Sequence, residues 1–278
     1  MTGTLRSKLA GSYTVWRLYH SFVADAVSLQ RPTKFKFVYQ FLDGDLGTVA
    51  DIGCGPGVFL RYLSARADTV WAVDRDAAAL QRLAARHHGD PKLRLVAADI
   101  AQLPFQPGGF DTVVFLEVLE HLIDDQAALQ QLHGLLKPGG RLLLSVPVPP
   151  GEINRDDPWG HKREGYALPE LERLLESNGF SVERHGFAQF RYSRLAERAL
   201  RAWRNALHLP APIFLSWICY LDYLFGVDSR SSGQHMPSSV VVLARQKTPS
   251  LGVPASMQTS QPVIHRQARL LDKAGATV

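Results

Sequence analysis

Three glycines that follow a short apolar run are the first residues in this sequence whose types and spacing point to ligand binding. The run is residues 49–52, and Gly53, Gly55 and Gly57 come directly after it. Positions without side chains let a ligand lie against backbone N–H groups at the start of a helix, where polar and anionic ligands bind readily. We therefore expect a nucleotide-like ligand at this loop.

The spacing of these glycines distinguishes two kinds of nucleotide. A dinucleotide fingerprint places its third glycine five positions after the first. In this sequence that position is Val58, and the third glycine is Gly57. The spacing therefore disfavours NAD. A glycine loop is also compatible with a purely structural turn, so a ligand site needs support from further groups.

Two acidic residues supply those groups. Asp74 ends the next apolar run, roughly twenty residues after Gly55, where a carboxylate can accept hydrogen bonds from two ribose hydroxyls. Asp99 and Ile100 follow the third run, where the acid can accept a hydrogen bond from an adenine amino group and the isoleucine can pack on the ring. Each carboxylate alone would also suit a helix N-cap. Their joint placement at successive strand ends favours an adenosine-containing ligand.

The elements that position these groups are predicted from the alternation of apolar runs and helical stretches between residues 48 and 145. Such alternation is typical of βαβ units around a parallel sheet. The first five strands are predicted at 49–52, 70–73, 93–96, 112–115 and 142–144. Helices are predicted at 16–27, 37–42 and 168–177, later strands at 180–187 and 238–245, and a type II turn at 137–140.

At this point the sequence resembles the class I S-adenosylmethionine-dependent methyltransferases, in particular the broad group that includes the ubiquinone-biosynthesis type. The resemblance covers residues 35–146 closely. The motifs of the group are matched in order by residues 51–57, Asp74, Asp99 with 103–105, 110–111 with 117–121, and 136–140.

The resemblance implies an α/β fold of the Rossmann-like, doubly wound type. Its sheet would have seven strands in the order 3-2-1-4-5-7-6, with the last strand antiparallel. The predicted elements add a helical N-terminal cap over 1–44 and a helical insertion over 188–237, before the last strand. We therefore expect one methyltransferase domain over 1–246, followed by a flexible tail over 247–278, where Pro, Ser and Gln are frequent and periodicity is lost.

The resemblance also implies the cofactor, S-adenosylmethionine. Its methionine end would lie near Asp51 and Gly53, its ribose at Asp74 and its adenine at Asp99 and Ile100. The motif positions extend the predicted cofactor-binding set to Cys54, Gly55, Gly57, Arg75, Leu116 and Glu117.

Methyl transfer from a sulfonium needs a nucleophile positioned in line with the methyl carbon, and a general base helps where the nucleophile carries a proton. Our candidates for that base are His121, His161 and Tyr166. The last two follow the fifth predicted strand, at the sheet edge where an acceptor is expected. Histidines in loops are also commonly plain surface residues.

Glu117, Glu120 and His121 are spaced so that they would share one face of a helix, where they could hold a divalent metal with His161 as a fourth ligand. The competing interpretation is that the glutamates favour a helix N-terminus through its dipole while His121 packs beneath the substrate. From the sequence alone we assign no metal ligand.

Within the insertion, arginines gather on one side of a predicted helix and apolar residues on the other. Arg191, Arg194, Arg198, Arg201 and Arg204 fall within one arc of the helical wheel, and an apolar, aromatic stretch follows at 213–225. This pattern is compatible with peripheral membrane contact through residues 191–226, or with a roof over a lipidic acceptor. A solvated arginine face over a cap core, or a dimer contact, is the alternative. The oligomeric state is not predicted.

Composition sets broader limits. The net charge of +5 and the pI of about 9.3 permit an anionic partner without requiring one, and we expect no nucleic-acid partner. Cys54 and Cys219 form neither a disulfide framework nor a zinc spacing, which favours the cytoplasm. We expect neither a secretory signal nor a transmembrane helix, because the most apolar segment, 212–225, is short and contains Asp222.

These features predict methyl transfer from S-adenosylmethionine to a small-molecule or lipid-linked acceptor, on oxygen rather than on carbon or nitrogen. The alternatives are a non-catalytic cofactor-binding or regulatory protein on the same fold and, disfavoured by Val58, an NAD-dependent oxidoreductase.

Overall fold

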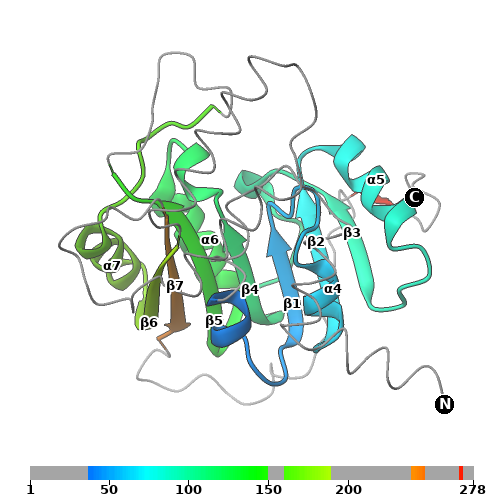
Figure 1. The fold of residues 1–278 in the computed structure, drawn as a ribbon, viewed down its shortest axis with the longest axis horizontal. Coiled ribbons are helices and arrows are strands. Elements are labelled where there is room, and N and C mark those ends of the chain that lie inside the picture. Colours follow the sequence, from blue (N-terminus) through cyan, green and yellow to red (C-terminus); the bar gives the residue numbers. More distant parts are fainter. Residues whose placement is uncertain (1–36, 150–159, 189–238, 248–268, 272–278) are drawn as a thin grey trace, which may run out of the picture. The chain divides into compact units, whose positions relative to one another are not determined.

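The computed structural model describes residues 37–149, 160–188, 239–247 and 269–271 (Figure 1). The chain divides into two units, one made of residues 1–42 with 185–241 and the other of residues 43–184 with 242–278. In the first unit the described part includes a helical turn at 37–41. The second unit contains the glycine loop and every candidate site residue.

A single sheet organises the second unit. Its strand order is β6-β7-β5-β4-β1-β2-β3-β8. From β3 to β6 this is the predicted order 3-2-1-4-5-7-6, which is confirmed, and β7 runs antiparallel to its neighbours (Figure 1). The strands are β1 (Gly47–Ile52), β2 (Ala67–Asp74), β3 (Leu93–Ala97), β4 (Phe110–Leu116), β5 (Leu136–Pro147), β6 (Phe180–Ala188), β7 (Ser239–Gln246) and β8 (Arg269–Leu271).

The eighth strand corrects the prediction for the tail. A flexible tail was predicted for residues 247–278, but Arg269–Leu271 pairs antiparallel with β3, with Val96 opposite Leu270. Three residues are too few for a period to be recognised in the sequence. The pairing runs through the backbone ladder with β3, at that edge of the sheet.

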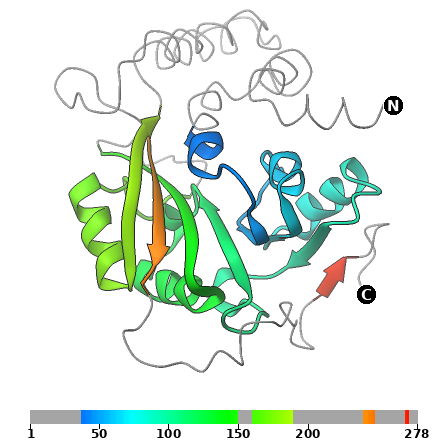
Figure 2. The same cartoon turned by 90° about the horizontal axis from the view of Figure 1, so that it is seen from below.

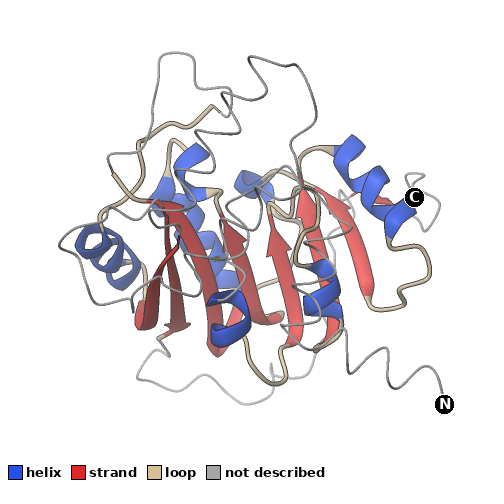
Figure 3. Ribbon diagram, in the orientation of Figure 1, coloured by secondary structure: helices blue, strands red, loops and turns tan. Residues whose placement is uncertain are grey.

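Helices cover both faces of the sheet, with α4 and α5 on one side and α6 and α7 on the other (Figures 2 and 3). Asp76 begins α5 by accepting hydrogen bonds from the backbone N–H groups of Ala78 and Ala79, and Asp124 begins α6 in the same way through Ala127. The helices are α4 (Leu60–Ser64), α5 (Ala77–Arg86), α6 (Asp125–Leu135) and α7 (Leu168–Ser177), with 3₁₀ turns η1 (Ile100–Gln102) and η2 (Leu119–His121).

The central strands explain why the sequence folds this way. Residues 113–115 of β4 and 142–144 of β5 are fully buried, as expected for parallel strands covered on both faces. Such strands need continuous apolar runs instead of alternating ones, and these are the runs on which the predictions rested.

The predicted turn at 137–140 lies inside β5. The strand begins at Leu136, which pairs with Phe110, and the register then shifts so that Arg141 pairs with Thr112. Residues 137–140 therefore form a bulge in the ladder. Gly139 has the positive φ of 74° that the type II turn requires, so the local conformation was predicted and its place in the sheet was not.

Two predicted regions lie outside the described residues: the helix at 16–27 and the insertion at 188–237, apart from its first residue. No helix in the part of the chain that the structure describes is long and apolar enough to cross a membrane.

Candidate active site

The glycine loop leaves β1 and is fixed at once to the neighbouring strand. The backbone N–H groups of Gly53 and Cys54 both donate to the carbonyl oxygen of Val73, at 2.8 and 3.0 Å. The sequence predicted that the loop opens directly into a helix, and the structure shows that it does not. It continues through turns to Phe59, where the five-residue helix α4 is capped. Every N–H of residues 53–57 is bonded within the protein, so the loop offers a ligand open space and not free N–H donors.

The three loop glycines differ in what surrounds them. A Cβ at Gly53 would lie 2.5 Å from Val118, and a Cβ at Gly57 would lie 2.4 Å from Leu83. A Cβ at Gly55 would meet nothing within 4 Å. Gly53 and Gly57 are thus required for packing, whereas Gly55 leaves open space over the backbone, as a ligand-binding loop needs.

Asp74 ties the loop to β2. One carboxylate oxygen accepts a hydrogen bond of 2.8 Å from the Gly55 N–H, and the other accepts one of 2.9 Å from the Asp76 N–H. The sequence predicted a ligand-binding carboxylate here but not these backbone bonds. Each carboxylate oxygen has a second lone pair, so the group keeps the capacity to accept from two hydroxyls.

Asp51, at the end of β1, is buried with only 4% of its surface exposed. Burial, and secondarily the charge of Asp74, raises the pKa of its carboxyl group to about 7. A ligand ammonium near this group would reverse the shift by stabilising the carboxylate. The neighbouring Cys54 is buried as a free thiol, and burial raises its pKa, which opposes a nucleophilic role.

Asp99 and Ile100 follow β3 as predicted. The Asp99 side chain accepts a hydrogen bond of 2.9 Å from the Ala101 N–H and so caps η1. It is exposed, as is Arg75 beyond β2, and Ile100 is half-buried. The capping role and the ligand role are compatible, because one N–H uses one of about four lone-pair sites of a carboxylate.

Glu117 corrects the predicted helix face. It lies just after Leu116, the last residue of β4, with a φ of 56°, a left-handed conformation that side chains rarely adopt. Its N–H donates to the Ser145 carbonyl, and the Ser145 hydroxyl donates to its carboxylate at 2.8 Å. Since only Leu119–His121 then form a 3₁₀ turn, no helix aligns Glu117 with Glu120 and His121. The sequence offered no signal for the role of Ser145.

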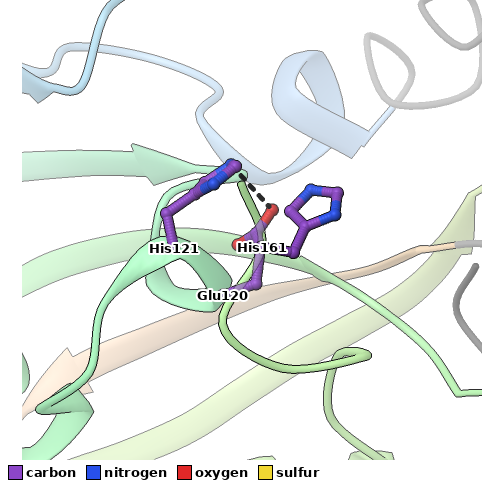
Figure 4. A group of neighbouring side chains, drawn as sticks. All are labelled: Glu120, His121 and His161. Atoms are coloured by element: carbon purple, nitrogen blue, oxygen red, sulfur yellow. Dashed lines mark ion pairs between the residues drawn. The ribbon is translucent and has the colours of Figure 1, made fainter. Parts of the chain in front are cut away.

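His121 and His161 are brought together, although forty residues separate them in the chain. Their ring centroids lie 4.6 Å apart, and His121 Nε2 lies 4.0 Å from a carboxylate oxygen of the buried Glu120 (Figure 4). We call Glu120, His121 and His161 the histidine–glutamate cluster. Its three side chains come from η2 and from the segment after β5, and they point toward one another.

Tyr166 is placed differently from the two histidines. Its ring is 1% exposed, and its hydroxyl donates to Asp125 on α6 at 3.0 Å. Burial first, and then the Asp125 carboxylate, raises its pKa, so the phenol stays protonated at neutral pH. Arg163 completes the arrangement with an ion pair of 3.1 Å to Asp125. The sequence singled out neither Asp125 nor Arg163.

The site thus combines an open glycine loop, carboxylates after three neighbouring strands and a pair of histidines. These groups can bind a cationic, ribose-bearing ligand and move a proton. Comparison with known proteins agrees with this arrangement. The family model described as "Methyltransferase domain" matches residues 50–144.

Two curated relatives illustrate the similarity. An uncharacterized methyltransferase of Mycobacterium tuberculosis is 41% identical over 111 residues, covering 39% of this chain and 56% of the relative. A ubiquinone biosynthesis O-methyltransferase of Pseudomonas paraeruginosa is 36% identical over 107 residues, covering 36% of this chain and 44% of the relative. The chain spans about half the length of these curated relatives.

Among solved structures, the N-methyltransferase NodS from Bradyrhizobium japonicum, in complex with S-adenosyl-L-homocysteine, has a TM-score of 0.54 and 19% identity, and the match covers 87% of this chain and 96% of that one. At this identity the likeness bears on the fold alone. Residues 50–144 therefore form a methyltransferase domain of the class I S-adenosylmethionine-dependent type.

Proposed function

We propose that this chain transfers a methyl group from S-adenosylmethionine to an oxygen atom of a small-molecule or lipid-linked acceptor. The observation that carries the proposal is the loop at 53–57, open over Gly55 and tied by its N–H to Asp74. A carboxylate fixed beside an exposed backbone loop at the carboxyl edge of a parallel sheet suits a ribose-bearing ligand.

The donor fits the residues present. Asp74 retains lone pairs for two ribose hydroxyls, and Asp99 with Ile100 would hold adenine. The donor's methionine end carries an ammonium, which would stabilise the buried Asp51 carboxylate near Gly53. Cys54, Gly55, Gly57, Arg75, Leu116 and Glu117 remain the predicted lining of the rest of this site.

When bound, the donor supplies an electrophilic methyl group on a sulfonium. The chain's own part is to orient an acceptor in line with that methyl and to remove its proton. His121 and His161 are the proposed bases. Their pairing favours oxygen as the nucleophile, because a hydroxyl must lose a proton to attack well, whereas a neutral amine does not.

Calorimetric titration tests the donor assignment. We expect S-adenosylmethionine to bind to the full chain with micromolar affinity and NAD not to bind. Methyl transfer from labelled donor into cell extracts, with membrane and soluble fractions compared, then tests for turnover. Donor binding without any transfer would favour the non-catalytic alternative, and binding of NAD in place of the donor would refute the proposal.

Donor affinity is expected to depend on pH through Asp51. In the donor-free chain its raised pKa of about 7 means that folding favours the protonated form, so this group's contribution to stability is lost as pH rises toward 7. Donor binding needs the carboxylate and therefore gains from the same rise. We expect affinity to increase roughly tenfold between about pH 5.5 and pH 7.

Calorimetry at several pH values measures this trend, and Asp51→Asn should flatten it. The donor ammonium stays protonated in this range, since an α-amino group has a pKa of about 7.7 to 8.0, so it does not cause the trend. An equally steep trend in Asp51→Asn would show that another group is responsible.

Tyr166 is expected to support the site structurally. Tyr166→Phe removes a buried hydrogen bond to the Asp125 carboxylate, so the free energy of unfolding should fall by about 1.5 to 3 kcal/mol. Denaturant titration measures the loss, and methyl transfer by the folded variant should persist. A variant of unchanged stability that has lost transfer would instead restore Tyr166 as the base.

The arginine-rich segment at 191–207, outside the described residues, supports a lipid-linked acceptor. If this segment contacts anionic headgroups, each nearby arginine contributes about 1 kcal/mol, weakened by salt. We expect salt-sensitive flotation with anionic vesicles, reduced when Arg194, Arg198 and Arg201 are all changed to Gln. A wild-type chain that never floats at low salt would favour a cap or dimer element.

A further inference from the structure

The histidine–glutamate cluster brings together three metal-ligating atoms. One carboxylate oxygen of Glu120 and one ring nitrogen each of His121 and His161 lie within 4.8 Å of one another. Figure 4 shows the three side chains converging from two separate segments. The sequence suggested a different set, which included Glu117. In the structure Glu117 is not part of this set, because its carboxylate accepts a hydrogen bond from Ser145. His161 does belong to it, since its ring lies beside that of His121.

Two imidazoles and one carboxylate are a donor set for borderline divalent cations such as Zn²⁺ and Mn²⁺. With bonds of about 2.0 to 2.2 Å to one ion, the donor atoms would lie about 3 Å apart. The 4.0 Å between Glu120 and His121 exceeds that spacing by about 1 Å. Small side-chain rotations would bring the three donors to one centre, since they already face one another.

The burial of Glu120 adds a second observation. This side chain is fully buried, and a carboxylate out of contact with water is costly unless positive charge stabilises it. A divalent cation held between Glu120 and the histidines would add positive charge beside this buried carboxylate. Both histidines are half-buried, so an ion bound there would keep positions open to a further ligand.

The segment that carries His161 is hydrogen-bonded to the turn that carries Glu120 and His121. The Lys162 N–H donates to the Glu120 carbonyl oxygen at 2.8 Å, which joins the two parts of the cluster through the backbone. Asp125 then binds both Arg163 and Tyr166. Contacts that fix ligand-bearing segments in this way lower the cost of ordering a metal site.

The cluster also lies near the proposed donor site. Val118, two residues before Glu120, is the side chain that a Cβ at Gly53 would strike at 2.5 Å. The loop proposed to receive the methionine end of the donor therefore packs against the chain leading into the cluster. A ligand on an ion held by the cluster would be close to the methyl group.

We propose that Glu120, His121 and His161 bind one divalent cation of the Zn²⁺ or Mn²⁺ class, which holds the acceptor oxygen for transfer. This rests on the proposed function. With both histidines bound to the ion, neither acts as the base: the acceptor O–H, made more acidic by the cation, loses its proton to solvent, and the oxygen forms a bond to the methyl carbon. The carbon–sulfur bond breaks at the same time, and its electron pair stays on the sulfur of the neutral thioether product.

Metal binding is tested directly on the full chain after chelator treatment. We expect calorimetric titration with Zn²⁺ or Mn²⁺ to give one site per chain. Glu120→Gln, His121→Ala and His161→Ala should each weaken that site at least tenfold. His88→Ala, which removes an exposed histidine outside the cluster, is the matched control and should leave it unchanged.

Titration of the wild-type chain with Co²⁺ gives a readout that does not depend on how the variants fold. Coordination by the two histidines should produce visible absorption bands that saturate at one equivalent and disappear when Zn²⁺ is added. Absence of a saturable site, or a site that persists in all three cluster variants, would overturn the proposal.

Donor binding separates failure of this inference from failure of the proposed function. The metal-free chain and the folded variants should still bind S-adenosylmethionine, and the metal-free chain should transfer methyl at least tenfold more slowly until metal is restored. Normal transfer after complete metal removal would refute the metal site while leaving the methyltransferase assignment intact. Loss of donor binding in the untreated chain would refute that assignment itself.

Discussion

Asp74→Ala is expected to weaken donor binding by at least tenfold. The substitution removes the acceptor of two ribose hydrogen bonds to a charged group, each worth roughly 1.5 to 3 kcal/mol. It also removes the acceptor of the Gly55 and Asp76 N–H groups, so the loop loses its attachment to β2. Asp74→Asn, which keeps one acceptor oxygen, should fall between Ala and wild type. Calorimetry with S-adenosylmethionine measures all three.

Asp76 provides the matched control for this experiment. It carries the same side chain two residues further on, and its carboxylate caps α5 through Ala78 and Ala79. Asp76→Ala should therefore cost about 1 kcal/mol of stability, the usual value of an N-cap, while donor affinity stays within twofold. A folded Asp74→Ala with wild-type affinity, or an equal loss in both variants, would contradict the assignment of Asp74 to the ribose.

Most of the fold could be predicted because its signals are local. β4 and β5 each contain a short apolar run, at 113–115 and 142–144, and α7 ends at the predicted residues because Asn178 and Gly179 stop it. The strand order came from the family resemblance. β8 could not be predicted, since three residues have no detectable period and the pairing depends on β3. The bulge in β5 was missed because ladder register is a property of two strands.

The same distinction applies to the site. Residues that act through their own position in an element, such as Asp74 at the end of β2, were identified from spacing. Residues that act through a partner far away in the sequence could not be identified in this way. Ser145 meets Glu117, and Asp125 meets Tyr166, only because β5 and the segment after it return to the end of β4. Glu117 has a positive φ and is therefore not part of a helix, contrary to the prediction. No periodicity in the sequence indicates this backbone conformation.

Substitution of Gly55 and Gly57 is expected to separate ligand binding from folding within a single loop. Both have positive φ, of 52° and 72°, so an alanine costs about 1 kcal/mol in backbone conformation at either position. At Gly57 the new methyl would also strike Leu83 at 2.4 Å and Leu60 at 2.7 Å. At Gly55 it would enter open space.

Gly57→Ala should therefore lose a further 1 to 3 kcal/mol or so from overpacking, measured by thermal or denaturant unfolding, with correspondingly poor yield of folded protein. Gly55→Ala should stay folded, and its free energy of unfolding should fall only by the cost of placing alanine at a positive φ. Its methyl would stand where the donor approaches the loop, so its affinity for S-adenosylmethionine should fall at least tenfold, since steric overlap in a close-packed site is worth several times the thermal energy. Wild-type donor affinity in a folded Gly55→Ala would place the ligand elsewhere. If Gly57→Ala were as stable as Gly55→Ala, the close contact with Leu83 would not constrain the loop, and the third glycine would have to be explained by ligand approach alone.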